Sequence, residues 1–138
     1  MRRYQGMTVA VVALTLVLGG VGLAQAGVSI DRLTAVQYTG GEGLFVAFLY
    51  VATTDKTIDA TLLLPNPDAK GNTELHPIAD LSLPNHKVFK FATKGTPVNT
   101  AGDVIEALVV DPGIPEELLL DQAAATCNPF GRQFFLCR

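Results

Sequence analysis

The chain of 138 residues lacks tryptophan and is poor in basic residues. Without tryptophan the usual aromatic platform for stacking against sugars is missing, and Tyr38 and Tyr50 are the only tyrosines after residue 26. Lys and Arg number 10 against 13 Asp and Glu, and two of the basic residues, Arg2 and Arg3, stand at the N-terminus. A nucleic-acid-binding protein would carry a strongly basic surface, so no nucleic-acid partner is expected.

Side chains for covalent catalysis are also scarce. Beyond residue 26 the only serines are Ser29 and Ser82, and neither lies in the glycine-flanked turn that presents a hydrolase nucleophile. The acidic pairs Asp55 with Asp59 and residues 116–117 have the residue types of a glycosidase acid and base, but exposed charge is their ordinary explanation. No glycine-rich loop leads from an expected strand into a helix to hold a phosphate. We therefore expect neither an enzyme nor a bound cofactor.

Two groups of polar residues contain metal-ligand atoms. His76, His86 and Asp80 offer two imidazoles and a carboxylate, but His76 precedes a proline and His86 lies in an expected turn, whereas catalytic zinc needs three well-placed ligands. Residues 66–74 faintly resemble an oxygen-rich calcium loop, yet the twelfth position is Pro77 rather than an acid. The oxygen-bearing side chains of that loop are Asn66, Asp68, Asn72 and Glu74. Loop and turn formation accounts for both groups, and no metal site is assigned.

The N-terminal segment has the three parts of an export signal. Arg2 and Arg3 supply positive charge, residues 7–18 form an apolar run broken only by threonine, and Ala24 and Ala26 are small residues at the positions read by signal peptidase. The alternative is a retained membrane anchor, which needs about 20 continuous apolar residues, more than this run supplies. We predict that residues 1–26 are a cleavable signal peptide. The remaining domain would then act outside the cytoplasm, secreted or periplasmic, without stable membrane insertion.

Export decides how the two cysteines are interpreted. Cys127 and Cys137 are an even pair near the C-terminus, and an oxidising compartment favours a disulfide bond between them. Residues 128–131 have the sequence of a type I turn, which would place Cys127 opposite Arg132. The bond would then close a small C-terminal lasso rather than link two facing strand positions. Residues 134–136 inside it are expected to be held against the core by the bond. The alternative is that they form an exposed apolar surface for contact with another molecule.

Residues 27–138 have the length of one domain and consist of short β-like runs divided by turn residues. Residues 44–52 form a nearly unbroken apolar run whose two faces both need covering, and this implies two packed layers. Residues 73–83 contain Pro77, which suits a weaker strand at the sheet edge. Further strands are expected over residues 30–38, 57–64, 87–93 and 103–111.

One segment favours a helix. Pro115 suits a first helical position, the acids at 116 and 117 suit the first turn, and residues 118–125 are rich in leucine and alanine. The alternative is a further strand through residues 117–121. Three adjacent leucines do not distinguish the apolar spacing of a helix from that of a strand. We therefore predict a mainly β protein, a small two-layer antiparallel β-sandwich of immunoglobulin-like size. It would carry a short C-terminal helix and a disulfide-closed C-terminal loop.

These features favour a non-catalytic binding or structural module of the cell envelope or the extracellular space. It would act through contacts with another protein or an envelope component, and the edge near residues 73–83 is where a second chain could pair. The alternative is a carrier of a small apolar ligand, held in a cavity between the two sheets and lined by the Phe-rich and Leu-rich strands.

Overall fold

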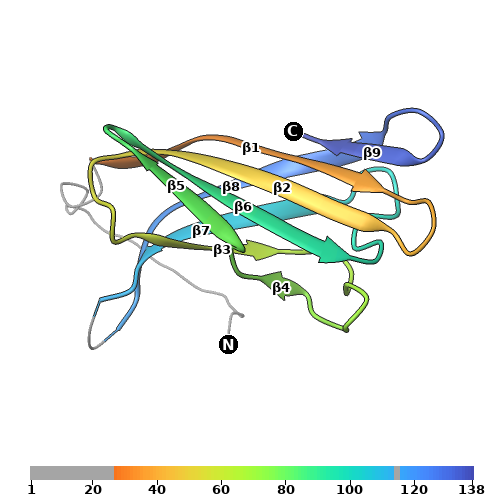
Figure 1. Cartoon of the computed structure of the whole chain (residues 1–138), viewed down its shortest axis with the longest axis horizontal. Helices are drawn as coiled ribbons and strands as arrows, with labels where there is room; N and C mark the ends of the chain where they lie inside the picture. The colour runs from red at the N-terminus through yellow and green to blue at the C-terminus, as the bar shows by residue number, and fades with distance from the viewer. Residues whose placement is uncertain (1–26, 114–115) are drawn as a thin grey trace.

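The computed structural model describes residues 27–113 and 116–138 (Figure 1). These residues contain nine β-strands and no helix. The predicted signal peptide, residues 1–26, lies outside the described residues, as does Pro115, the expected start of the helix. The strands are β1 (Val28–Tyr38), β2 (Leu44–Thr53), β3 (Asp59–Leu63), β4 (Glu74–Leu75), β5 (Ala79–Leu83), β6 (His86–Lys94), β7 (Val104–Asp111), β8 (Leu118–Pro129) and β9 (Phe134–Cys137).

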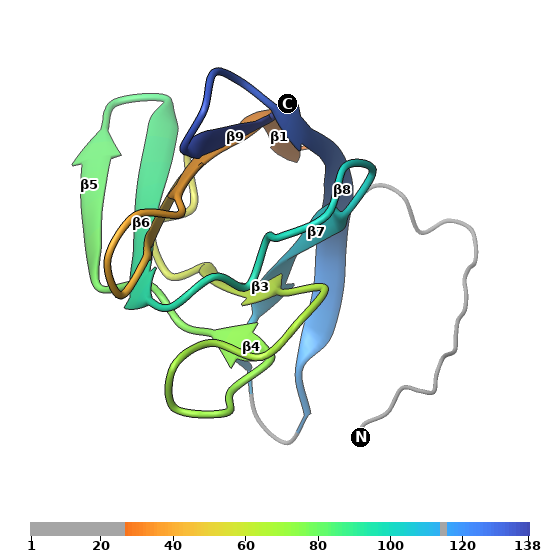
Figure 2. The same cartoon turned by 90° about the vertical axis from the view of Figure 1, so that its right-hand side faces the viewer.

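All nine strands belong to one antiparallel sheet in the order β4-β3-β7-β8-β9-β1-β2-β6-β5. Figure 2 shows that this sheet is folded over on itself, so that its strands surround a common interior. We call β5, β6, β2, β1 and β9 the first half, and β4, β3, β7 and β8 the second half. Buried apolar residues of both halves form one core cluster, which confirms the predicted two-layer antiparallel sandwich.

The core is built from one side of each long strand. In β2, Phe45, Ala47, Leu49 and Val51 are fully buried, as the period of two in a strand requires. The other fully or nearly fully buried strand residues include Phe89 and Phe91 of β6, Ala60 and Leu62 of β3, and Ile105, Ala107 and Val109 of β7. Each large apolar side chain buried in this way contributes about 1.5–3 kcal/mol relative to exposure.

A register shift in β1 keeps both ends of this strand in contact with the core. The pairing of β1 with β2 is irregular between Ile30 and Arg32. The side chains that point inward are therefore at even-numbered positions before the shift, as at Val28, and at odd-numbered positions after it, as at Leu33. At the shift, the backbone N–H of Ile30 donates to Asp121 Oδ2 at 2.8 Å. This bond fastens β1 to β8, across the junction of the two halves.

The C-terminal helix prediction was wrong, because residues 118–125 lie in the twelve-residue strand β8. Its register runs from Leu118 opposite Asp111 to Thr126 opposite Val104, with one irregularity. Leucine and alanine favour a helix by only a few tenths of a kcal/mol per residue, whereas strand pairing satisfies the backbone and turns Ala125 towards the core. The alternative strand over residues 117–121 was therefore the better interpretation.

The edge prediction for residues 73–83 is confirmed, but these residues form two strands instead of one. β4 pairs with β3 at one end of the strand order, and β5 pairs with β6 at the other end. Residues 76–78 connect them and contain Pro77, which has no N–H for a sheet ladder. One short stretch of sequence thus supplies both outer strands of the sheet.

Candidate functional site

The predicted Cys127–Cys137 disulfide is present and buried. The two cysteines are directly opposite each other in the pairing of β8 with β9, with their Cα atoms 4.0 Å apart. The bond is therefore a cross-strand link, and the expected lasso was wrong. Because β8 also pairs with β7, the bond lies where the first half meets the second.

The turn expected at residues 128–131 was also wrong. Pro129 still belongs to β8, and the loop closes where the N–H of Phe130 donates to the carbonyl of Phe134 at 2.8 Å. Placing Cys127 opposite Arg132 would need a two-residue hairpin loop starting at Pro129. Such loops favour a positive φ at their first residue, which the proline ring forbids. The longer loop places Gly131 at a φ of 81° instead.

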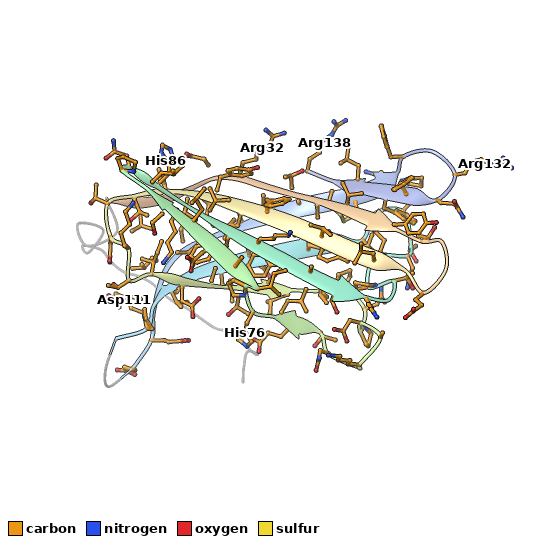
Figure 3. All side chains as sticks on the ribbon, in the orientation of Figure 1. Arg32, His76, His86, Asp111, Arg132 and Arg138 are labelled. Carbon is orange, nitrogen blue, oxygen red and sulfur yellow. A yellow bond between two sulfur atoms is a disulfide. The ribbon has the colours of Figure 1, made fainter. Side chains whose placement is uncertain are left out.

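The histidines considered as metal ligands are separated in the structure, as Figure 3 shows. His76 Nε2 lies 3.9 Å from Glu74, whereas His86 Nε2 lies 3.3 Å from Asp31. Asp80 lies 3.9 Å from the ammonium group of Lys87. Across residues 27–113 and 116–138 no group of three or more His, Cys, Asp or Glu side chains is placed to hold a metal ion.

In the loop that faintly resembled a calcium site, Asp68 organises a turn. One carboxylate oxygen accepts the backbone N–H groups of Lys70 and Asn72 at 2.9 and 2.8 Å. The other accepts the hydroxyl of Thr93 at 2.6 Å, which ties this second-half loop to β6. The Thr93 hydroxyl, followed by these backbone donors, lowers the pKa of Asp68 below its ordinary value. These oxygen atoms already accept hydrogen bonds within the protein.

The acidic pairs likewise serve local structure. The hydroxyl of Thr57 and then its backbone N–H bond to Asp55 and lower the pKa of that carboxyl group. Asp59 accepts the N–H of Ala60 at 2.8 Å instead, and Glu116 and Glu117 are exposed. Asp55 and Asp59 thus bind different backbone groups.

The sequence analysis missed the role of Gln37, whose side chain is fully buried. Its amide nitrogen donates to the carbonyls of Gly95 and Leu44 at 2.9 and 3.3 Å, and its amide oxygen accepts the N–H of Val98 at 3.2 Å. Residues 95–103 lead from β6 in the first half to β7 in the second. Gln37 therefore fastens the connection between the halves. Its place in the inward phase of β1, two residues after Ala35, is the signal that could have revealed this role.

Lys87 also faces the interior, because it lies on the same side of β6 as the buried Phe89. Its ammonium group donates to the carbonyls of Lys56 and Ile58 at 2.7 and 3.3 Å and lies 5.3 Å from the centre of the Phe89 ring. These contacts give Lys87 a structural role at one end of the core, and Asp80 lies nearby.

The most distinctive surface is the outward side of the first half. The sequence predicted that both faces of residues 44–52 would be covered, but Leu44 is 46% exposed, and Val46, Phe48 and Tyr50 are half-buried. The register aligns these residues with apolar neighbours on adjacent strands: Leu136, Val36, Val46 and Ala92 form one row, Phe134, Tyr38 and Leu44 form a second, and Tyr50, Val88 and Leu81 form a third. We call these three rows the outer apolar face.

At the β9 end this surface continues into an open recess. The recess has a volume of about 560 Å³ and is lined by Val36 and by residues 130–136 of the β8–β9 hairpin. Phe130 is 65% exposed, and the rings of Phe134 and Tyr38 lie 5.3 Å apart. A Cβ atom at Gly40 would lie 2.2 Å from the Tyr38 hydroxyl, so glycine is needed there for the ring to occupy this place. The hairpin thus adds an aromatic cluster to the face.

The expectation that residues 134–136 would be clamped onto the core holds for only one of them. Phe135 packs against the core, whereas Phe134 is exposed and Leu136 is half-buried on the outward side. Phe134 therefore lies on the exposed surface, as the alternative required, and not in the core.

Basic side chains accompany the outer apolar face. Lys90 stands opposite Phe48, Lys94 opposite Leu44, and Arg32 opposite Tyr50. Figure 3 shows Arg32 and Arg138 projecting from the upper side of the fold, and Arg132 at the end formed by the β8–β9 hairpin. The strands of the second half contain no lysine or arginine and carry Asp59, Glu74, Glu106, Asp111 and Asp121.

No protein-family model, curated protein or solved structure matches this chain. Within the described part of the chain no helix is long and apolar enough to cross a membrane. The outer apolar face must therefore be interpreted from its own chemistry. It offers a broad apolar and aromatic surface with basic groups among and beside its rows, an arrangement suited to binding.

Proposed function

We propose that this chain is an exported, non-catalytic interaction module whose outer apolar face binds another protein of the cell envelope or the extracellular space. The observation that carries the proposal is the continuity of apolar residues across four neighbouring strands on the outside of the fold. Large contiguous exposed apolar patches are uncommon on monomeric proteins and mark sites where another molecule removes them from water.

The composition of the face fits a protein partner. Protein interfaces combine an apolar and aromatic centre with a polar rim, and arginine is enriched among their charged residues. Here Tyr50, Tyr38 and Phe134 supply aromatic contact area. Arg32 stands opposite Tyr50, and Arg132 lines the recess with Phe134. Strand pairing already orders the backbone beneath these side chains, so little backbone conformational entropy is lost when a partner binds.

The disulfide supports the exported location. A buried, cross-strand cystine persists in an oxidising compartment and is uncommon in a reducing cytosol. A secreted or periplasmic location therefore suits the observed chemistry. The mass of the chain purified from its own host tests this directly, because removal of residues 1–26 and loss of two hydrogen atoms at the cystine both change it.

The ligand-carrier alternative receives less support. It requires space between the sheets, but the inward side chains there, including Phe45, Phe89 and Phe91, are fully or almost fully buried in a shared core. The apolar recess opens on the outside of the hairpin instead. A surface contact is therefore the function that the geometry supports best.

The proposal is tested by site-specific photo-crosslinking in the native compartment. The full chain is produced in its host with a photoreactive amino acid at Val36, in the middle of the face, and in a matched sample at Gln122, an exposed position on the outer side of β8. We expect a discrete protein adduct from position 36 and none from position 122. The adduct's partner is then purified, and Val36→Lys should weaken its binding by about tenfold or more.

Equal crosslinking at both positions, adducts with lipid alone, or no adduct at position 36 would each contradict the proposal. Circular dichroism of Val36→Lys shows whether the variant is folded, so that a loss of binding is not confused with unfolding.

A further inference from the structure

The outermost strand of the first half, β5, has a free edge. It ends the strand order and pairs only with β6, and Figure 2 shows no described strand beyond it. All five of its residues are exposed, and Leu81 and the preceding Ile78 are 57% and 58% exposed. An exposed strand edge presents unpaired backbone groups that can hydrogen-bond to another strand.

The usual protections of an edge strand are weak here. Natural proteins block such edges with lysine, proline, a bulge, an inward-pointing charge or a very short strand. The only charged residue in β5 is Asp80, which lies 3.9 Å from Lys87, and Pro77 and Pro84 both stand outside the strand. The register of β5 with β6 is continuous over all five residues. The strand is thus regular along its whole length.

The β5–β6 hairpin is also held in place. The ammonium group of Lys56 donates to the carbonyls of Leu83 and His86, on the two sides of the turn. A hairpin fixed in this way can accept another strand with little further ordering.

The sequence of β5 identifies the strand that fits it. Residues 79–83 read Ala-Asp-Leu-Ser-Leu, an alternation of apolar and polar residues that is symmetric about Leu81. We propose that β5 pairs with β5 of a second copy of this chain, antiparallel about a two-fold axis at Leu81. Leu81 then stands opposite the partner's Leu81, and Ala79 stands opposite the partner's Leu83.

Side-chain chemistry agrees with this register. Ala79, Leu81 and Leu83 of both copies lie on the side of the outer apolar face, because Leu81 is aligned with Val88 of that face. On the other side Asp80 stands opposite the partner's Ser82, whose hydroxyl can donate to the carboxylate. The two Asp80 residues are diagonal neighbours about 7–8 Å apart, and the nearby Lys87 of each chain offsets their repulsion.

The pairing is made by the backbone edge of β5, with Leu81 of the outer apolar face at its centre, and it does not require the partner binding proposed above. It would join the first halves of two copies into one continuous sheet and extend their outer apolar faces into a single surface. A two-fold, self-complementary contact of this kind closes on itself and yields a dimer.

Analytical ultracentrifugation of the processed, disulfide-bonded protein tests the association. We expect a dimer whose population increases with protein concentration, and Leu81→Lys should raise its dissociation constant by about tenfold or more. Val36→Lys is the matched control, because Val36 is also an exposed apolar strand residue but has β2 and β9 on its two sides. It should leave the dimer unchanged while weakening the partner binding proposed above.

Cysteine substitution tests the register. Leu81→Cys should form an intermolecular disulfide on mild oxidation, because the two positions face each other at the axis. Ala79→Cys should not, because the two copies of residue 79 would be separated by four strand residues, about 13 Å, whereas a disulfide needs Cα atoms within about 7 Å.

A protein that stays monomeric at up to about 1 mM, a dimer unaffected by Leu81→Lys, or equal crosslinking at positions 79 and 81 would each overturn the proposal. Circular dichroism of Leu81→Lys shows whether this variant is folded, so that a loss of the dimer is not confused with unfolding.

Discussion

The two halves of the folded sheet share one core but differ on their outer sides. The first half presents apolar rows with Lys90, Lys94 and Arg32 beside them, whereas the second half carries only acidic charges on its strands. On the second half the register aligns Thr61, Leu108 and Gln122 in one row, and Leu63, Glu106 and Ala124 in another. Folding requires apolar side chains on the inner sides of both halves. Binding specificity can therefore come from the outer sides, where the side chains of the two halves differ.

The halves are also joined by particular bonds. The Cys127–Cys137 disulfide, the Gln37 amide and the Asp68–Thr93 hydrogen bond each connect the halves or the segments between them. If the halves form one cooperative unit with two different outer sides, substitutions inside either half should destabilise both, whereas outward substitutions should not.

The largest effect is expected from core residues. Phe45→Ala in the first half should lower the free energy of unfolding by about 3–5 kcal/mol, and Ile105→Ala in the second half by about 2–5 kcal/mol, because both side chains are fully buried. Phe48→Ala, on the outward side of β2, should cost only about 1 kcal/mol. Urea unfolding followed by circular dichroism measures these values. Two separate unfolding transitions, one for each half, would contradict the expectation that the halves unfold as one cooperative unit.

Removal of the disulfide should have the next largest effect. Replacing both Cys127 and Cys137 with alanine should cost about 2–4 kcal/mol, since the bond restricts the unfolded chain and links β8 to β9. Wild-type protein unfolded in the presence of a reductant is the control and should show a similar loss. A change below about 1 kcal/mol would mean that the strand pairing alone holds the junction.

Gln37→Leu should cost about 1–3 kcal/mol, because the carbonyl of Gly95 and the N–H of Val98 lose their partner inside the protein. Gln122→Leu is the matched control on the exposed side of β8 and should change stability by about 0.5 kcal/mol or less. Equal effects of the two substitutions would show that Gln37 does not fasten the connection between the halves. Thermal unfolding monitored by circular dichroism provides the measurement.

The smallest effect concerns pH. Because the folded state lowers the pKa of Asp68, its contribution to stability is present above the unfolded pKa, near 4, and is lost as the pH falls through the lower folded value. Thr93→Val removes the main donor and should cost about 1 kcal/mol at neutral pH, and this difference from wild type should shrink below about pH 4. Thr61→Val, a half-buried threonine of β3, should show no such dependence. A difference that stays constant down to about pH 2 would contradict this role.

Much of the fold could be predicted from residue patterns. The apolar runs in residues 44–52 and 103–111 correctly identified β2 and β7, because a strand with one side in the core must be apolar at least at every second position. The even pair of cysteines correctly indicated a bond. Pro77 correctly placed its segment at an edge, since proline cannot take part in a central ladder.

Other features depended on distant residues. Residues 118–125 have helix-favouring side chains, and only pairing with β7 makes them a strand. The pattern of β2 could not show that Phe48 and Leu44 remain partly uncovered, because what lies over a sheet is decided by the rest of the chain.

The amino-acid sequence alone determined that residues 44–52 and 103–111 are apolar strands, that the segment around Pro77 lies at an edge, and that an even pair of thiols is available for a bond, because these depend on neighbouring residues and their side-chain chemistry. Only the tertiary structure decided that Cys127 faces Cys137, that Gln37 joins two distant segments, and that apolar rows line up on an outer side. Those properties depend on strand register and strand order, which arise when residues far apart in the chain pair with one another.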